Sequence, residues 1–223
     1  MIRSRFAPRD GTRAGWSGRQ ARRDSTDRVG PDTLNRVNDL APGLLVAAPP
    51  LGDPNFDRSV VLLAAHGPDG AFGWIINGRE VMTLSELLVR SEVTTEEVDV
   101  DGIVRIGGPV SPEQVWLVYR SADRFDEIDG QFEVGSGIIA SASRKVLETV
   151  AGNRASRSVM GLVGYAGWAP SQLEEEIRVG AWLPTDVSPD LVFDVPRSEI
   201  WQRAYERIGA SPMAFASRTV GEA

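Results

Sequence analysis

The sequence predicts a single α+β domain in which strands outnumber helices. The chain has 223 residues, of which 42% are hydrophobic, and this is enough for one domain with a buried core. From Gly43 onward, short apolar runs rich in Val, Leu and Ile are separated by Gly, Pro and Asp, a pattern typical of strands. Short turn sequences join most of these runs. This favours antiparallel pairing over the regular strand–helix alternation of a doubly wound fold.

The first strands are predicted at 44–48 and 60–66, because both runs are almost wholly apolar and too short for helices, as expected for strands buried on both faces. The segment 49–58 between them contains three prolines and is predicted to be a shaped loop. The next strand, 71–77, follows the turn sequence Gly67-Pro68-Asp69-Gly70. Together these features predict an antiparallel hairpin.

A first helix is predicted to begin after Thr83 and to end near Arg90. Thr83 and Glu86 have the spacing of a capping box, in which each side chain accepts a hydrogen bond from the backbone of the other residue. The apolar stripe of this helix consists of Leu84, Leu87 and Leu88.

The rest of the chain continues the mixed pattern. Pro170 stands in the first turn of one predicted helix, and Gly152 and Gly209 end two others. Further strands are predicted at 103–106, 114–119, 131–134, 137–140 and 159–164, and further helices at 143–151, 170–179 and 197–208.

Charge divides the chain into a basic N-terminal segment and an acidic body. Residues 1–38 hold nine Arg and four acidic residues, a net charge of +5, whereas residues 39–223 carry –12. We predict a disordered Arg-rich tail at 1–38, a domain at 39–210 and a C-terminal extension at 211–223. The acidic body would repel a phosphate backbone, so contact with nucleic acid is expected only through the tail. No apolar run is long enough for a membrane span.

Composition excludes several chemistries. The chain has no Cys and one His, which removes thiol nucleophiles, iron–sulfur clusters and nearly all zinc sites. Gly135-Ser136-Gly137 lacks the helix start and the later acid of a dinucleotide fingerprint, and the acidic loop 97–102 lacks the last ligand of a calcium loop. We therefore predict no catalytic residues, no metal site and no cofactor.

Two titratable features are interpreted as structural. His66 ends a strand before a turn and is expected to lie at the surface or to form a local hydrogen bond. A Ser-His-acid triad would have to use His66 as its base, because no other imidazole exists. Glu174, Glu175 and Glu176 are expected to form the face of a helix start, since adjacent helical residues point in different directions.

Two glycine-rich segments are candidates for a pocket wall. Tyr165 and Trp168 lie among three glycines just before a predicted helix, where free backbone amides could accept an anion. The alternative is a tightly packed strand-to-helix turn. Gly107 and Gly108, between two predicted strands, have the same two interpretations.

These segments resemble the YqgE/AlgH family of bacterial proteins over about residues 40–209. The order and spacing of the motifs make the resemblance specific. The motifs are Leu44-Leu45-Val46-Ala47-Ala48-Pro49, Asp53-Pro54-x-Phe56-x-Arg58-Ser59-Val60-Val61, Gly70-Ala71-x-Gly73-x-Ile75-x-Asn77, Gly107-Gly108-Pro109-Val110, Gly164-Tyr165-Ala166-Gly167-Trp168 and Gln172-Leu173-Glu174 with Trp182.

The resemblance implies a single α+β domain with a small, branched, barrel-like sheet surrounded by helices, usually in the cytoplasm. It implies no established enzymatic activity. Family members are often described as transcriptional regulators because of a link to alginate control, although they have no recognised DNA-binding motif. The chain departs from the family at Asn77-Gly78-Arg79, where the family usually has N-x-P. This change replaces a stiff turn with a flexible one and adds a cation.

Two functions follow as hypotheses. The first is a non-enzymatic regulatory or adaptor protein that is cytoplasmic, linked to transcription and acts through contacts with a protein partner not yet identified. The alternative is a module, or an enzyme of unknown reaction, that binds a small molecule or an anion in a pocket of glycine-rich loops. The predicted pocket residues are Asp53, Arg58, Ser59 and Asn77 as polar anchors, Gly107, Gly108 and Tyr165 beside them, and Trp168 as an apolar wall.

Overall fold

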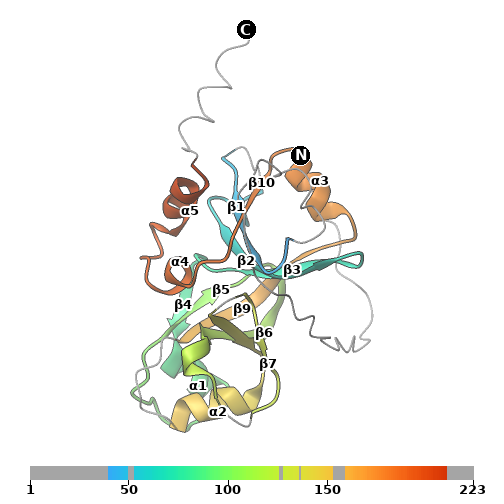
Figure 1. Cartoon of the computed structure of the whole chain (residues 1–223). Coiled ribbons are helices and arrows are strands. Elements are labelled where there is room, and N and C mark those ends of the chain that lie inside the picture. Colours follow the sequence, from blue (N-terminus) through green and yellow to red (C-terminus); the bar gives the residue numbers. More distant parts are fainter. Residues whose placement is uncertain (1–39, 50–52, 126–127, 136, 153–158, 210–223) are drawn as a thin grey trace.

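Ten strands form one curled sheet, and five α-helices surround it, in the part of the chain that the structure describes (Figure 1). This structure is a computed structural model, and it describes residues 40–49, 53–125, 128–135, 137–152 and 159–209. The α+β class and the mostly antiparallel, branched sheet are confirmed. The predicted tail at 1–38 and the extension at 211–223 lie outside the described residues, so the predicted domain limits stay predictions.

Eight strands form the main path of the sheet, and two more branch from it. Strands β4 and β5 form the branch, because β5 pairs with both β4 and β9. The main path runs β10 (Trp182–Thr185), β1 (Gly43–Ala47), β2 (Val60–Gly67), β3 (Gly70–Ile75), β9 (Val159–Trp168), β6 (Val110–Arg120), β8 (Ile138–Ser141) and β7 (Gln131–Glu133). The branch consists of β4 (Glu80–Thr83) and β5 (Ile103–Ile106).

The branch arises because β9 is long enough to serve two sets of neighbours. Its first half lies between β5, to which it is parallel, and β6, to which it is antiparallel. Its second half pairs antiparallel with β3. The change of partner occurs near Gly164, where φ is +71° and a Cβ atom would collide with the carbonyl oxygen of Gly108.

The glycine-rich end of β9 corrects one prediction. The two interpretations of segment 165–168 are a pocket wall with free backbone amides and a tightly packed strand-to-helix turn, but Ala166 to Trp168 continue the strand and pair with β3. Most other strand predictions are confirmed, including the hairpin at Gly67 and Gly70. The sequence did not predict β4, β10 or the short helix α4 (Pro189–Phe193).

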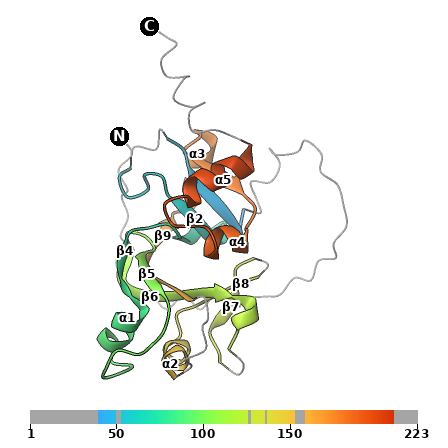
Figure 2. The same ribbon diagram turned by 90° about the vertical axis from the view of Figure 1, so that its left-hand side faces the viewer.

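The helices cover the sheet on three sides (Figures 1 and 2). The capping box of α1 is confirmed, because the Thr83 hydroxyl accepts from the amide of Glu86 at 3.1 Å and the Glu86 carboxylate accepts from the amide of Thr83 at 2.8 Å. No helix in the described ranges is long and apolar enough to cross a membrane. The remaining helices are α1 (Leu84–Arg90), α2 (Arg144–Gly152), α3 (Gln172–Arg178) and α5 (Ile200–Ile208), with a 3₁₀ turn at Ser121–Asp123.

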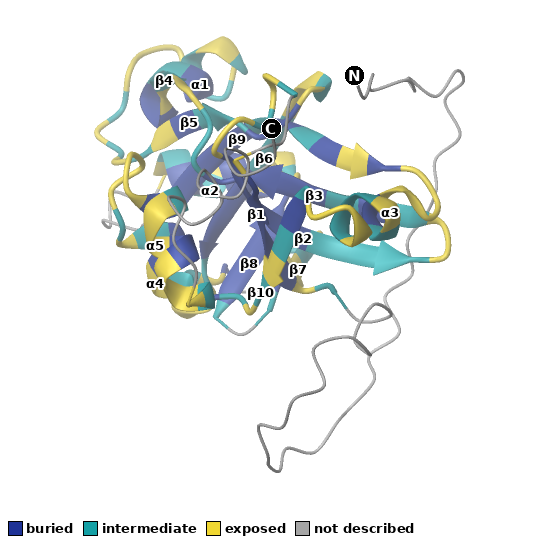
Figure 3. Cartoon of the chain, turned by 90° about the horizontal axis from the view of Figure 1, so that it is seen from above, coloured by how far each residue is buried: buried dark blue, intermediate teal, exposed yellow. Residues whose placement is uncertain are grey.

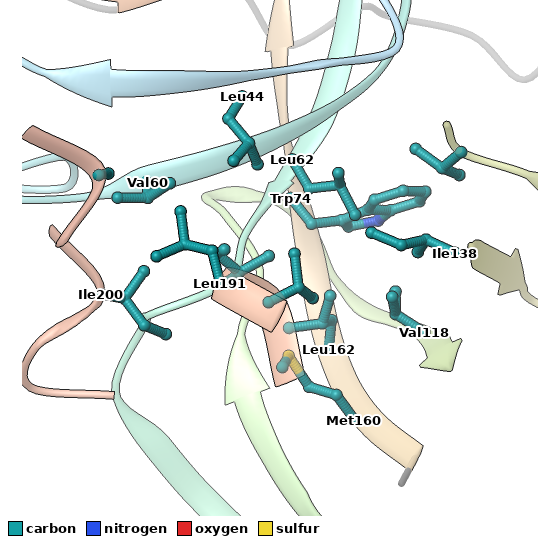
Figure 4. Packing of buried hydrophobic residues seen from close by; sticks show 14 of the residues in the cluster. Leu44, Val60, Leu62, Trp74, Val118, Ile138, Met160, Leu162, Leu191 and Ile200 are labelled. Carbon is teal, nitrogen blue, oxygen red and sulfur yellow. The ribbon is translucent and has the colours of Figure 1, made fainter. Parts of the chain in front are cut away.

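Each helical layer buries one hydrophobic cluster against the sheet. Helices α1 and α2 cover a cluster on β5, β6 and β9, α3 covers a second on β1 to β3, and α4 and α5 cover the third. In β1, Leu44 and Val46 face the α4–α5 side while Leu45 and Ala47 face α3, which confirms the prediction of a strand buried on both faces. Figure 3 shows the buried strands at the centre, and Figure 4 shows the packing around Trp74.

Candidate functional site

Asp53 and Ser59, two of the predicted polar anchors, shape the loop that contains them. The Asp53 carboxylate accepts hydrogen bonds from the backbone and side-chain amides of Asn55 at 2.9 and 3.0 Å. The Ser59 hydroxyl is buried and donates to the carbonyl of Phe56 at 3.0 Å. These bonds hold the loop in a compact turn.

The Asn77 side chain, just after β3, forms hydrogen bonds with the end of the loop that contains Asp53 and Ser59. Its side-chain oxygen accepts from the amide of Val60 at 2.8 Å, and its side-chain nitrogen donates to the carbonyl of Arg58 at 2.8 Å. Arg58 has a positive φ of 49°, and its exposed guanidinium lies 5.5 Å from the centre of the Trp201 ring, in a cation–π contact. The structure thus brings Arg58, Ser59 and Asn77 together.

Gly107 and Gly108 allow a close backbone crossing against β9. The amide of Gly107 donates to the carbonyl of Val163 at 2.7 Å, and its carbonyl accepts from the amide of Ile75 at 2.8 Å. Gly108 has φ of +155°, and a Cβ atom there would collide with the backbone of Tyr165. The glycines are therefore required for packing, whether or not a ligand binds beside them.

Trp168 lies on the other face of the sheet from Tyr165. The residue is 7% exposed, and its indole N–H donates to Oε2 of Glu176 at 2.8 Å, as does the indole N–H of Trp182. Trp168 belongs to the cluster beneath α3, whereas Tyr165 packs against the cluster that α4 and α5 cover. Phe56 links the predicted loop to the Trp168 side. A single pocket walled by all eight predicted residues stays a prediction.

His66 differs from its expected setting. Its side chain is 3% exposed, and Nε2 lies 3.1 Å from Oε1 of Glu174, a residue 108 positions away. The imidazole is therefore buried, and its partner on α3 is distant in sequence. Glu175 instead pairs with Arg178 at 2.6 Å, and the three consecutive glutamates point in different directions, as predicted.

Sequence reasoning missed an aromatic cluster formed by five rings. Its members come from β3, β6, β7 and β9, and they lie on the face that includes Tyr165. Ring centroids are 4.8 to 6.3 Å apart for every pair in contact. The aromatic cluster consists of Phe72, Trp74, Trp116, Phe132 and Tyr165.

Solvent exposure within the aromatic cluster increases from Trp74, at its base, to Phe132, at its rim. Trp74 is fully buried, whereas Phe72, Trp116 and Tyr165 are half-buried. Phe132, on the edge strand β7, is 40% exposed and is one of three large hydrophobic side chains exposed in the described chain. The aromatic cluster thus extends from the core to the surface.

Two polar atoms in the aromatic cluster have no hydrogen-bond acceptor among the described residues. They are the indole nitrogens of Trp74 and Trp116, both buried from solvent. The indoles of Trp168, Trp182 and Trp201 each donate a hydrogen bond at 2.8 Å. Because buried donors in native proteins almost always find acceptors, the two orphaned N–H groups need an explanation.

The described residues contain no group of three or more His, Asp or Glu side chains placed to hold a metal ion. Their fold defines a class of single-domain α+β proteins in which a long strand joins the parts of a curled, branched sheet.

Comparisons with known proteins identify the family. The sequence matches the AlgH-like family over residues 44–213. A UPF0301 protein of Anaeromyxobacter dehalogenans is 41% identical over 181 residues, which are 79% of this chain and 91% of that protein. A UPF0301 protein of Stenotrophomonas maltophilia is 37% identical over 171 residues, covering 76% of this chain and 89% of the relative. The chain therefore belongs to the AlgH-like family.

Solved structures agree. The solution structure of the AlgH protein from Pseudomonas aeruginosa is similar with a TM-score of 0.64 and 27% identity, covering 89% of this chain and all of that one. A crystal structure of a protein from Corynebacterium diphtheriae has a TM-score of 0.59 and 24% identity over 82% of this chain and 90% of that one, and shows the same fold.

Proposed function

We propose that this protein is a regulatory domain that binds a small planar molecule at the aromatic cluster. The observation that carries the proposal is the pair of buried, unpartnered indole N–H groups of Trp74 and Trp116. Each buried donor without an acceptor costs about 1–3 kcal/mol, and a ligand that supplies acceptors would recover this energy.

The chemistry of the aromatic cluster defines the ligand class. Aromatic faces favour flat, largely apolar molecules, which can stack between rings. The two N–H donors favour a ligand with carbonyl or carboxylate oxygens, and the Trp74 and Trp116 rings are 4.9 Å apart, so that one polar group could serve both. The ligand is therefore a planar molecule with an acceptor group at its buried end.

Entry is through the rim of the aromatic cluster. Phe132 contacts Trp116 at a centroid distance of 6.1 Å and Trp74 at 6.3 Å, and at 40% exposed it is the most exposed ring of the aromatic cluster. It lies on β7, a strand of three residues at the end of the sheet. A rotation of this single side chain is the movement that admits the ligand.

The regulatory or adaptor role, the cytoplasmic location and the protein partner complete the proposal. They derive from the family resemblance. Binding of the small molecule would alter the surface formed by Phe132 and the neighbouring strand, and a protein partner would recognise that surface. Recovery of the same partner by affinity capture, with a yield that changes on Phe132→Ala substitution, supports this role. Capture that is independent of Phe132 contradicts it.

The first prediction tests the small-molecule site with naphthoate as a planar acid and naphthalene as its neutral analogue. Isothermal titration calorimetry of the full chain should give saturable binding of naphthoate and weaker binding of naphthalene. Trp116→Phe keeps an aromatic ring but removes one N–H, and it should weaken naphthoate binding by about tenfold, the value of one hydrogen bond to a charged group.

The matched control is Trp201→Phe, because that indole already donates to the carbonyl of Ala47. It should leave naphthoate affinity unchanged. If the wild-type chain binds neither compound, or if Trp116→Phe binds naphthoate as tightly as the wild type, the proposed site is wrong.

A further inference from the structure

Another orphaned donor lies in a different part of the molecule, on Arg105 of β5. This side chain is 14% exposed, and its Nη1 donates to the carbonyl of Ile76 at 2.8 Å. Its Nε is buried and has no acceptor in the described ranges. A guanidinium presents its five N–H donors in one rigid plane. In Arg105, Nη1 is used by the bond to Ile76, whereas the N–H of Nε is unused.

The acidic partner of Arg105 is Glu80, which also faces Arg197 and lies too far from both arginines for a strong hydrogen bond. Glu80 is its cross-strand partner in β4, and Oε1 of Glu80 lies 3.5 Å from Arg105 Nη2. The same oxygen lies 3.7 Å from Nε of Arg197, which precedes α5. Both separations exceed those of a good charge-assisted hydrogen bond, about 2.7–2.9 Å. One half-exposed carboxylate therefore stands between two guanidiniums, and the group carries a net charge of +1.

Burial lowers the pKa of Arg105 from its usual value; Glu80 opposes this shift, and Arg197 adds to it. The direction shows that the nearby Glu80 carboxylate does not offset the cost of burying the Arg105 cation. The net positive charge of the three side chains is local, because the body of the protein as a whole carries –12.

We propose that Arg105 and Arg197 form a binding site for a small oxyanion, with Glu80 as an internal carboxylate that the anion displaces. A phosphate group matches the site because its several oxygens can accept from both guanidiniums at once, including the unused Nε of Arg105. The site is separate from the aromatic cluster and does not depend on the proposed function.

The second prediction tests this site with inorganic phosphate on the full chain at constant ionic strength. Phosphate should raise the melting temperature in a saturable manner, and sodium chloride at the same ionic strength should not. Arg197→Ala should weaken phosphate binding by about tenfold. Arg203→Ala is the matched control, because that exposed arginine pairs with Glu199 and Glu206 on α5 and should leave phosphate affinity unchanged.

Glu80→Gln is the decisive variant, because it removes the carboxylate that competes for the site. It should tighten phosphate binding by up to about fivefold, the upper range for an exposed charge pair. Arg105→Lys keeps the charge but removes the planar fork, and it should weaken phosphate binding. Weaker binding by Glu80→Gln, or equal binding by wild type and Arg197→Ala, would overturn the proposal.

A final arm identifies the source of the phosphate. Glycerol phosphate that binds as tightly as inorganic phosphate supports a site for the free ion, and tighter binding supports a site for the phosphate of a larger molecule. Trp116→Phe should not affect either measurement, so failure of the aromatic site and failure of the oxyanion site give different results.

Discussion

The Glu176 side chain connects helix α3 to the strands beneath it through hydrogen bonds. Its Oε2 accepts the indole N–H groups of both Trp168 and Trp182, and its Oε1 accepts from Gln172 at 2.9 Å. The carboxylate satisfies two buried donors and ties α3 to the strands beneath it. In the sequence it is the third of three consecutive glutamates, and only the structure distinguishes its role from those of Glu174 and Glu175.

The third prediction concerns this carboxylate. Glu176→Ala leaves two buried indole N–H groups unpaired and should lower the free energy of unfolding by about 2–4 kcal/mol. Glu176→Gln retains an acceptor oxygen and should cost clearly less. Chemical denaturation followed by circular dichroism measures both values. Equal losses for the two variants would show that the hydrogen bonds to the indoles are not the cause.

The fourth prediction concerns Tyr205, which is fully buried and donates to the carbonyl of Ala47 at 3.2 Å. Burial raises the pKa of Tyr205 to about 12. The folded state therefore holds this proton more tightly than the unfolded state does, so its stabilising contribution is complete below the usual pKa and is lost as the pH rises toward 12.

Unfolding free energies of the wild type should thus fall between about pH 10 and 12, with no more than about 3 kcal/mol of the loss due to Tyr205. Tyr205→Phe should be less stable at pH 8 but should show a shallower alkaline loss. The same slope in both proteins would assign the alkaline loss to other groups.

The candidate site could be predicted from the sequence only in part. The i, i+2 spacing of Phe72 and Trp74 indicates one face of a strand, and this was the available signal for the aromatic cluster. Trp116, Phe132 and Tyr165 reach the same place only through the pairing of β6, β7, β8 and β9, which no local pattern encodes. His66 was misjudged for the same reason, since its partner lies on a helix 108 residues later.

At the scale of elements, the predictable parts are those with strong local signals. The capping box fixed the start of α1, and continuous apolar runs identified β1 and β2. Strand β10 was missed because it has four residues, one of them Pro184, which is tolerated there because β10 is an edge strand. Helix α4 has only five residues, too few to show a helical period.

The fifth prediction concerns the crossing of the segment before β6 over β9. Gly108→Ala places a methyl group against the Tyr165 backbone at a φ that L-residues rarely adopt, and it should destabilise the protein by more than about 3 kcal/mol. Gly152→Ala is the control, because nothing lies within 4 Å of a Cβ atom there.

Since Gly152 ends α2, its replacement by alanine should leave stability unchanged or raise it by up to about 1 kcal/mol. Thermal unfolding of both variants measures the contrast. A Gly108→Ala variant as stable as Gly152→Ala would show that the crossing can relax.

For the whole molecule, the sequence predicted the α+β class and one domain from strand length, hairpin turns and composition. The branched, barrel-like form of the sheet followed only from the family resemblance. The reason is that β9 combines its partners from three distant parts of the chain: β3, β5 and β6. Which strands pair over such distances depends on how well whole strands pack against one another. The hydrophobic periodicity within a single strand shows which face is buried but does not identify the neighbouring strand.

The position of β9 between several strands also affects how the domain unfolds. It supplies backbone partners to β3 beside the aromatic cluster and to β5 beside Arg105, so displacement of this one strand breaks pairing in both regions. The domain should therefore unfold as one cooperative unit. A ligand that stabilises one end of β9 should also lower the rate of hydrogen exchange at the other end.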